Sequence, residues 1–300
     1  MIVGDGHALP RAESREQHAQ KVLKGICRGE ACLALECFSQ SFLLPSALCP
    51  WLSASHNKTM RLIPSDHVAS LGHCLYTTLR LHDHRLLFWE EHLARLQASM
   101  RFFGFAPAWN AAELRVWIEQ KAPDSGLCRI TVTEQEVLVS FRGFKPIPEQ
   151  VTVLLTDHVV HPLLGLHKTG NHLPYTLAAQ QTFQAGAFEG LMWDASNNHV
   201  VDGTRAGFLI QKDGLWTEPL GGLPSVTRQV ALQELGVTAR AAWITLEDLL
   251  NADHLWLCGS GMGVLPVHTL KWKGEERHYA SSPLPVQQVG LIPPRAPEIP

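Results

Sequence analysis

The sequence predicts an α+β protein of two domains. Strand-like and helix-like stretches mix along the chain without the regular strand–helix–strand order of a parallel nucleotide-binding sheet, and neither GxGxxG nor GxxxxGK[ST] occurs. The stretch GFKPIPEQ, residues 143–150, holds two prolines and a glycine and predicts a domain boundary. We therefore expect an N-terminal extension without an assigned structure (1–60) and a smaller α+β domain (61–147). A larger second domain (148–290) and a C-terminal tail (291–300) are expected to follow.

The first half of the chain predicts a sheet with two helices. HCLYTTLRLH is rich in Thr, Tyr and Leu, as strands are, and Leu93, Leu96 and Met100 recur at helical spacing before a natural stop at Gly104. The expected elements are a strand over 73–82, helices over 86–104 and 110–122, and hairpin strands over 128–134 and 136–143.

The second half predicts more strands than helices. An Asn-rich turn and a Lys-Asp-Gly turn each separate two apolar runs, and Gly236 follows a helix-like run. The expected elements are a strand over 151–157, a helix over 174–185, a strand–turn–strand over 189–204, a hairpin over 207–219, a helix over 225–236, and a strand, glycine-rich turn and strand over 254–272.

Composition argues against several classes of partner. A formal net charge of −3 gives no reason to expect nucleic acid or an anionic membrane, and no apolar run reaches the roughly 18 residues of a membrane span. The 16 histidines are scattered, and the seven cysteines form no CxxC pair. We expect a cytoplasmic protein with reduced thiols, no secretory signal and no metal site.

One lysine stands in a stretch otherwise free of charge apart from its histidines. GLHKTGNHLPYTLAAQQ, residues 165–181, places Lys168 between an apolar approach and a helix-like run. Such a lysine is either an ordinary side chain that reaches to solvent or an amine whose pKa is lowered for chemistry. The stretch alone does not decide between these two interpretations.

Further features of the sequence favour the chemical interpretation. Asp202 ends a predicted strand, and LPSVTR, residues 223–228, opens a helix with hydroxyl groups in its first turn. The turn CGSGMG, residues 258–263, offers more backbone N–H groups, and Arg95 could bind a phosphate. An amine, an acid and a phosphate cradle together suggest pyridoxal 5′-phosphate, with a lysine imine and an acid at the pyridine nitrogen. Taken singly, each feature is usually a cap, a turn or a surface residue.

Several collinear stretches from about Ile63 to Val267 resemble the class IV, fold-type IV pyridoxal phosphate enzymes. IPSDHVASLGHCLYTTLRLHDHRLLFWEEHLARLQAS resembles the family's opening, and HKTGNHLPYTLAAQQ resembles its lysine segment. LWTEPLGGLPSVTR resembles its phosphate loop, and LCGSGMGVLPV resembles its closing strand. The resemblance implies two domains, a small N-terminal α/β domain and a larger pseudo-barrel domain like that of D-amino-acid aminotransferase, with the cofactor between them. It also implies a homodimer that acts on a small-molecule amine.

The resemblance also implies a role for individual residues. Lys168 would be the catalytic residue and would link covalently to the cofactor, while Asp202 would face the pyridine nitrogen. Tyr76 and Thr78 would lie near the substrate. The residues implied to surround the phosphate are Arg95, Val226, Thr227, Gly259, Ser260 and Gly261.

The sequence departs from the family at several of these positions. Asp202 stands for a glutamate, Gly207 and Gly259 stand for asparagines, Ser225 stands for a glycine, and Gly72-His73-Cys74 stands for Gly-Asp-Gly. LYTTLR favours the 4-amino-4-deoxychorismate lyase branch, which forms 4-aminobenzoate and pyruvate on the folate route. The alternatives are a transaminase of branched-chain or D-amino acids and a non-catalytic relative that keeps the fold.

Overall fold

The computed structural model describes residues 72–106, 109–134 and 136–286. Every described residue lies in one compact unit, which falls within residues 63–300. The expectations for residues 1–60 and 291–300, and the part of the family resemblance before residue 72, lie outside the described residues.

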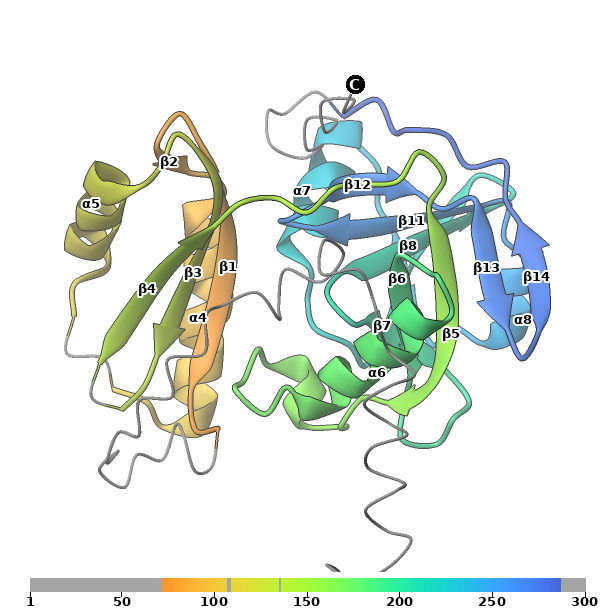
Figure 1. The fold of residues 1–300 in the computed structure, drawn as a ribbon, viewed down its shortest axis with the longest axis horizontal. Helices are drawn as coiled ribbons and strands as arrows, with labels where there is room; N and C mark the ends of the chain where they lie inside the picture. Colours follow the sequence, from red (N-terminus) through yellow and green to blue (C-terminus); the bar gives the residue numbers. More distant parts are fainter. Residues whose placement is uncertain (1–71, 107–108, 135, 287–300) are drawn as a thin grey trace, which may run out of the picture. The chain divides into compact units, whose positions relative to one another are not determined.

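The first sheet has the strand order β2-β1-β3-β4 and is antiparallel (Figure 1). One of its faces packs on α4 and α5 through a core that includes Leu79, Leu96 and Ile118. This arrangement follows from the alternation of side chains along strands, which puts every second residue of β1 and β3 on the helix side. The elements are β1 (Leu75–His82), β2 (Arg85–Leu86), α4 (Trp89–Phe103), α5 (Ala111–Lys121), β3 (Ser125–Val132) and β4 (Val137–Arg142).

Two five-stranded sheets follow and share one apolar core, which includes Leu191, Phe208 and Leu257. One five-stranded sheet has the order β14-β13-β5-β6-β7. Its strands are β5 (Thr152–Val159), β6 (Glu189–Trp193), β7 (Val200–Gly203), β13 (Thr269–Trp272) and β14 (Glu275–His278). The other five-stranded sheet has the order β10-β9-β8-β11-β12, and its strands are β8 (Gly207–Lys212), β9 (Leu215–Pro219), β10 (Arg240–Ala242), β11 (His254–Gly259) and β12 (Gly263–Pro266).

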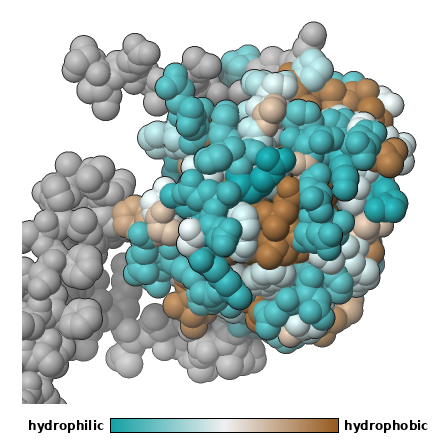
Figure 2. All heavy atoms as spheres, turned by 90° about the vertical axis from the view of Figure 1, so that its right-hand side faces the viewer, coloured by the Kyte–Doolittle hydropathy of each residue, from teal (hydrophilic) through white to brown (hydrophobic). Residues whose placement is uncertain are grey.

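Helices cover these two sheets from different sides. Helix α6 (Leu173–Gln184) packs on β5 and β6, whereas α7 (Val226–Leu235) packs on β8, β11 and β12. A 3₁₀ turn, η1 (Leu164–Leu166), precedes the lysine, and a short helix, α8 (Leu246–Asn251), precedes β11. On the side of β13, β14 and α8, most of the surface is hydrophilic, and a smaller hydrophobic area lies among the hydrophilic residues (Figure 2).

The structure confirms the mixed α+β class and most of the expected elements, with one substantive difference. The stretch after the glycine-rich turn was expected to be a single strand to residue 272, but it forms β12 and β13, which belong to different sheets. The chain changes sheets after Pro266, because Val267 N donates to Leu255 O while His268 N donates to Val151 O. Among the described residues, no helix is long and apolar enough to cross a membrane.

Candidate active site

The segment that carries Lys168 is paired with the first strand of the first sheet. Tyr76 N donates to Lys168 O at 2.8 Å, and Gly170 N donates to Cys74 O at 2.8 Å. A Cβ at Gly170 would lie 2.5 Å from Gly72 O, so only glycine allows this close approach. The backbone of the lysine segment is therefore held at β1 by hydrogen bonds on both sides of Thr169.

The Lys168 amine lies in a setting that favours its neutral form. Its Nζ is 5.0 Å from the centre of the Tyr76 ring. Burial and the positive charge of Arg95 lower the pKa of Lys168, and the carboxylate of Asp202 raises it, with a net pKa of about 8. An amine with this pKa is partly neutral near physiological pH and can accept a proton or attack a carbonyl.

Asp202 lies on β7 and is 6 % exposed. Its Oδ1 accepts from Gly203 N at 2.9 Å, and its Oδ2 accepts from Leu223 N at 3.2 Å. Burial raises the pKa of Asp202 to about 6, although these hydrogen bonds and Lys168 act in the opposite direction. The loop that carries Leu223 can come this close because residue 222 is glycine, where a Cβ would lie 2.0 Å from Val201 O.

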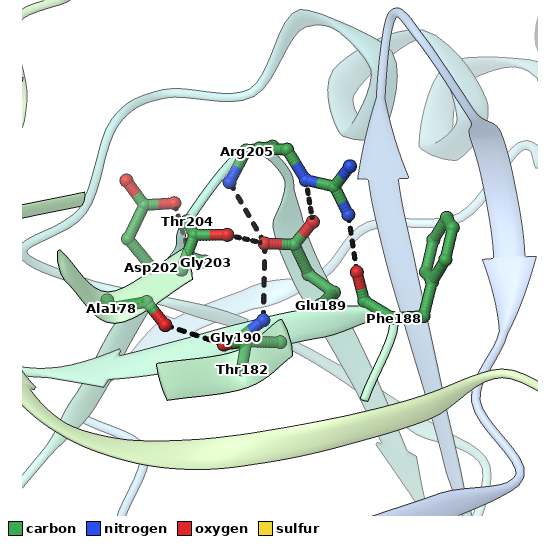
Figure 3. Close-up of polar contacts among 9 residues, drawn as sticks. All are labelled: Ala178, Thr182, Phe188, Glu189, Gly190, Asp202, Gly203, Thr204 and Arg205. Carbon is green, nitrogen blue, oxygen red and sulfur yellow. Dashed lines mark hydrogen bonds and ion pairs between the residues drawn. The ribbon is translucent and has the colours of Figure 1, made fainter. Parts of the chain in front are cut away.

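A buried carboxylate, Glu189 at the start of β6, supports the turn that follows Asp202 (Figure 3). Glu189 is 0 % exposed. Its Oε1 accepts from the Thr204 hydroxyl and from Arg205 N, and its Oε2 accepts from Arg205 Nε at 3.0 Å. Thr204 N also donates to Gly190 O at 2.9 Å. The end of β7, and with it Asp202, is thus tied to β6 by paired polar groups.

Arg95 on α4 belongs to a hydrogen-bonded chain that links four parts of the fold. Its Nη1 donates to Pro224 O at 2.8 Å, and its Nη2 donates to Thr77 Oγ1 at 3.1 Å. His92 Nδ1 lies 2.9 Å from the same Thr77 oxygen, and His92 Nε2 lies 3.4 Å from Ser260 Oγ. Burial, helped by Arg95 and Lys168, lowers the pKa of His92 well below its usual value, so the ring is neutral.

The predicted phosphate loop and glycine-rich turn lie side by side. Ser225 caps α7, because its Oγ accepts from Arg228 N at 3.3 Å and donates to Cys258 O at 3.3 Å. Val226 and Thr227 form the first turn of α7, where backbone N–H groups lack helical partners. Gly259 ends β11, and a Cβ there would meet Ala206 Cβ at 3.2 Å. A Cβ at Gly261 would meet Leu127 Cδ1 at 3.2 Å, so this turn borders the first sheet.

The two residues expected near the substrate share one face of β1. Tyr76 is buried, and its hydroxyl lies 3.2 Å from His172 Nδ1. Thr78 is half-buried and pairs with Arg129 in the β1–β3 ladder. Thr78 lies on the same face of β1 as Tyr76 because side chains alternate along a strand. Tyr76 is the one of the two whose ring contacts the Lys168 amine.

Sequence reasoning did not assign several residues that the structure brings to this site. His92, His172 and Glu189 carry hydrogen bonds within it, and Arg129 and Arg142 both act electrostatically on Lys168. The sequence signal for His92 is that it lies, like Arg95, in the stretch HLARL of the segment that resembles the family's opening. Within the described ranges, no group of His, Cys, Asp and Glu could hold a metal ion.

The donor set fits pyridoxal 5′-phosphate. Lys168 offers an amine that is partly neutral, and Asp202 offers a carboxylate on the same side of the fold, since the two shift one another's pKa. The start of α7, Ser260 and Arg95 offer the N–H, hydroxyl and guanidinium groups that bind phosphate. When bound, the cofactor supplies an electron sink at the carbon that bears the substrate amine.

Comparisons with known proteins show what this chain is similar to. The family model of amino-transferase class IV matches residues 74–270. The aminodeoxychorismate lyase of Vibrio harveyi is 25 % identical over 239 residues, 68 % of this chain and 88 % of that protein. The D-alanine aminotransferase of Bacillus licheniformis is 24 % identical over 68 % of this chain and 81 % of that protein. A solved structure provisionally assigned as a 4-amino-4-deoxychorismate lyase has 36 % identity and a TM-score of 0.63, and the match covers 70 % of this chain and 89 % of that one.

Proposed function

Because this chain belongs to the amino-transferase class IV family, whose enzymes depend on pyridoxal 5′-phosphate, we propose that it is a lyase that converts 4-amino-4-deoxychorismate to 4-aminobenzoate and pyruvate. The observation that carries the proposal is the Lys168 amine, whose pKa is lowered to about 8 beside Tyr76 and Asp202. The similarity to the lyase of Vibrio harveyi over 88 % of its length supports the choice of substrate.

The reaction needs one base that can also return a proton. Lys168 Nζ takes the proton from the ring carbon that bears the amine, and then gives a proton to the methylene carbon of the enolpyruvyl group. The C–O bond to the ring breaks, pyruvate leaves, and the ring becomes aromatic. The atoms balance without water or a second substrate, so one lysine is sufficient.

The other residues of the site would bind and orient the cofactor. The carboxylate of Asp202 would hold the proton on the pyridine nitrogen, which keeps that nitrogen positively charged. Arg95, Ser260 and the first turn of α7, with Val226 and Thr227, would hold the phosphate. In this arrangement, the hydrogen-bonded chain through His92 orients Arg95 and Ser260 together.

A class IV transaminase of D-amino or branched-chain amino acids is the second candidate. The similarity to D-alanine aminotransferase over 68 % of this chain favours it. The same lysine, acid and phosphate groups serve a transaminase, which differs in moving the amino group to the cofactor.

The test is release of pyruvate from 4-amino-4-deoxychorismate by the purified protein, with Lys168→Ala as the control. We expect pyruvate and 4-aminobenzoate in equal amounts from the wild type, and a rate at least about a thousandfold lower from the variant. Borohydride treatment followed by mass spectrometry should find the cofactor attached at residue 168. Equal release by both proteins, or no release, would refute the lyase.

The same preparation separates the alternatives. A transaminase would change its cofactor absorbance with D-alanine or leucine in the absence of a keto acid. A non-catalytic relative would purify without absorbance from a lysine-bound cofactor. We further propose that the enzyme is a homodimer and that it lies in the cytoplasm. The cytoplasm fits the buried thiols of Cys128 and Cys258, which form no disulfide.

A further inference from the structure

His92 on α4 is a buried histidine with a polar neighbour at each ring nitrogen. The residue is 2 % exposed. Its Nδ1 lies 2.9 Å from Thr77 Oγ1 and 3.4 Å from Arg95 Nη2. Its Nε2 lies 3.4 Å from Ser260 Oγ. Because a neutral imidazole donates at one nitrogen and accepts at the other, such a ring passes the direction of its hydrogen bonds from one side to the other.

The Arg95 guanidinium fixes which nitrogen of the His92 ring accepts. A guanidinium has only N–H donors, so His92 Nδ1 can bond to Arg95 Nη2 only as an acceptor. Arg95 Nη2 also donates to Thr77 Oγ1 at 3.1 Å, which leaves the hydroxyl hydrogen of Thr77 for donation to His92 Nδ1. Both contacts therefore require that Nδ1 carries no hydrogen.

The hydrogen of the neutral His92 ring consequently lies on Nε2. The ring is neutral because burial and the positive charges of Arg95 and Lys168 lower the pKa of His92 well below its usual value. The contact with Ser260 is thus a donation from His92 Nε2 to Ser260 Oγ. Since the Ser260 oxygen accepts this hydrogen, its own hydroxyl hydrogen is left for another acceptor.

Ser260 stands with two other kinds of donor at the expected phosphate site. Arg95 Nη1 donates to Pro224 O, directly before the Ser225 cap of α7, and the first turn of that helix offers N–H groups that lack helical partners. Guanidinium and backbone N–H groups can only donate, whereas a hydroxyl group can donate or accept. The direction set by His92 makes the hydroxyl a donor as well.

We propose that His92 is a positioning residue that directs the Ser260 hydroxyl hydrogen to the phosphate of the cofactor, and so strengthens the preference of the apoprotein for pyridoxal 5′-phosphate over pyridoxal. A phosphate dianion only accepts hydrogen bonds, so a pocket built from donors suits it. The inference rests on the phosphate site of the proposed function. It holds equally for a lyase and a transaminase, because it concerns cofactor binding alone.

Two replacements of His92 separate donation to Ser260 from the other roles of the ring. Glutamine can place an amide N–H near the position of Nε2, whereas asparagine is one methylene shorter and reaches only the position of Nδ1. His92→Gln should therefore keep the donation to Ser260, and His92→Asn should lose it. His268→Asn is the matched control, since half-buried His268 accepts from Val151 N at 3.0 Å and lies outside the candidate site.

The measurement is the dissociation constant of each apoprotein for pyridoxal 5′-phosphate and for pyridoxal, obtained by fluorescence titration. We expect His92→Asn to raise the first constant about tenfold and the second less than about twofold, because only the phosphate meets the Ser260 hydroxyl. His92→Gln and the His268→Asn control should stay close to the wild type for both ligands.

Ser260→Ala completes the experiment, because it removes the hydroxyl that His92 is proposed to direct. It should weaken binding of pyridoxal 5′-phosphate as much as His92→Asn does. The double variant should bind no more weakly than either single variant, since both changes remove the same hydrogen bond to the phosphate.

The outcomes separate this inference from the proposed lyase. No loss or an equal loss for both ligands in His92→Asn, a His92→Gln variant as weak as His92→Asn, or additive effects of His92→Asn and Ser260→Ala would each overturn it. If the His92 variants do not fold, NMR of the ring nitrogens in the wild type decides, because a hydrogen on Nδ1 contradicts the inference and one on Nε2 supports it. Pyruvate release is measured separately, so either conclusion can fail while the other holds.

Discussion

Lys168 and Asp202 show how one physical cause moves two pKa values toward each other. Burial disfavours charge on both groups, so it lowers the pKa of the lysine to about 8 and raises that of the aspartate to about 6. Each group also stabilises the charged form of the other. The pair is therefore balanced so that small changes in its surroundings shift its protons.

Removal of the aspartate charge should shift the titration of the lysine to lower pH. The rate at which the apoprotein takes up pyridoxal 5′-phosphate depends on the neutral amine, so it should rise with pH through about 8 in the wild type. Because the Asp202 carboxylate raises the pKa of Lys168, the midpoint in Asp202→Asn should lie below that of the wild type. Stopped-flow absorbance at a series of pH values measures both midpoints.

Asp157→Asn serves as the control for this experiment, since Asp157 is exposed and bonds to Gln181. Its midpoint should equal that of the wild type. A midpoint in Asp202→Asn at or above the wild-type value would show that the two side chains do not interact.

At the scale of the element, the start of α7 has a structural task and a proposed binding task. The Ser225 hydroxyl caps the helix and also contacts Cys258 O, while the next N–H groups are those that we propose to bind the phosphate. Thr245 caps α8 in a similar way, and Thr245 N in turn donates to Asp248 Oδ2, but Thr245 takes no part in the candidate site. Replacing each cap in turn therefore separates an effect on protein stability from an effect on cofactor binding.

Ser225→Ala and Thr245→Ala should each lower the free energy of unfolding of the apoprotein by about 1 kcal/mol, because each removes a helix cap. Only Ser225→Ala should raise the dissociation constant for pyridoxal 5′-phosphate. Urea denaturation gives the first quantity, and fluorescence titration gives the second. A similar loss of cofactor affinity in both variants would mean that Ser225 acts only through helix stability.

At the scale of the whole molecule, large apolar side chains flank the lysine segment on the surface. Leu163 and Leu166, just before Lys168 in the chain, are exposed. Leu173 and Leu177, one turn apart on α6, are exposed as well, and Leu173 is 67 % exposed. Apolar groups gathered beside a site are typical of a protein–protein interface. They support the proposed homodimer, and we expect its contact to lie next to Lys168.

Light scattering after size exclusion should give twice the mass of one chain for the wild type. Leu173→Asp together with Leu177→Asp should shift the protein to the mass of one chain, because the charges cannot be buried in an apolar contact. Val116→Asp on α5, where the side chain is also exposed, should leave the mass unchanged. A monomeric wild type, or a double variant that stays dimeric, would contradict this placement.

The sequence by itself determined most of the elements and their order, because their signals are local. Gly104 and Gly236 end helices with φ of 72° and 65°, and the turn after Lys212 has positive φ at both Asp213 and Gly214. The missed elements, such as β10, α8 and β14, are too short for a period to show. Lys168 could be singled out because an isolated charge in an apolar stretch is itself a local signal, and Asp202 because it ends a predicted strand.

Only the tertiary structure decided which distant groups meet. The pairing of residues 168–170 with β1, the change of sheet after Pro266 and the hydrogen-bonded chain from Ser260 through His92 to Arg95 all join residues far apart in the chain. Whether an arginine pairs with a carboxylate, as Arg205 does with Glu189, or lies against an aromatic ring, as Arg129 does against Tyr76, depends equally on long-range packing. Propensity and spacing report a residue's neighbours in sequence, whereas these contacts depend on how strands pair and turns close.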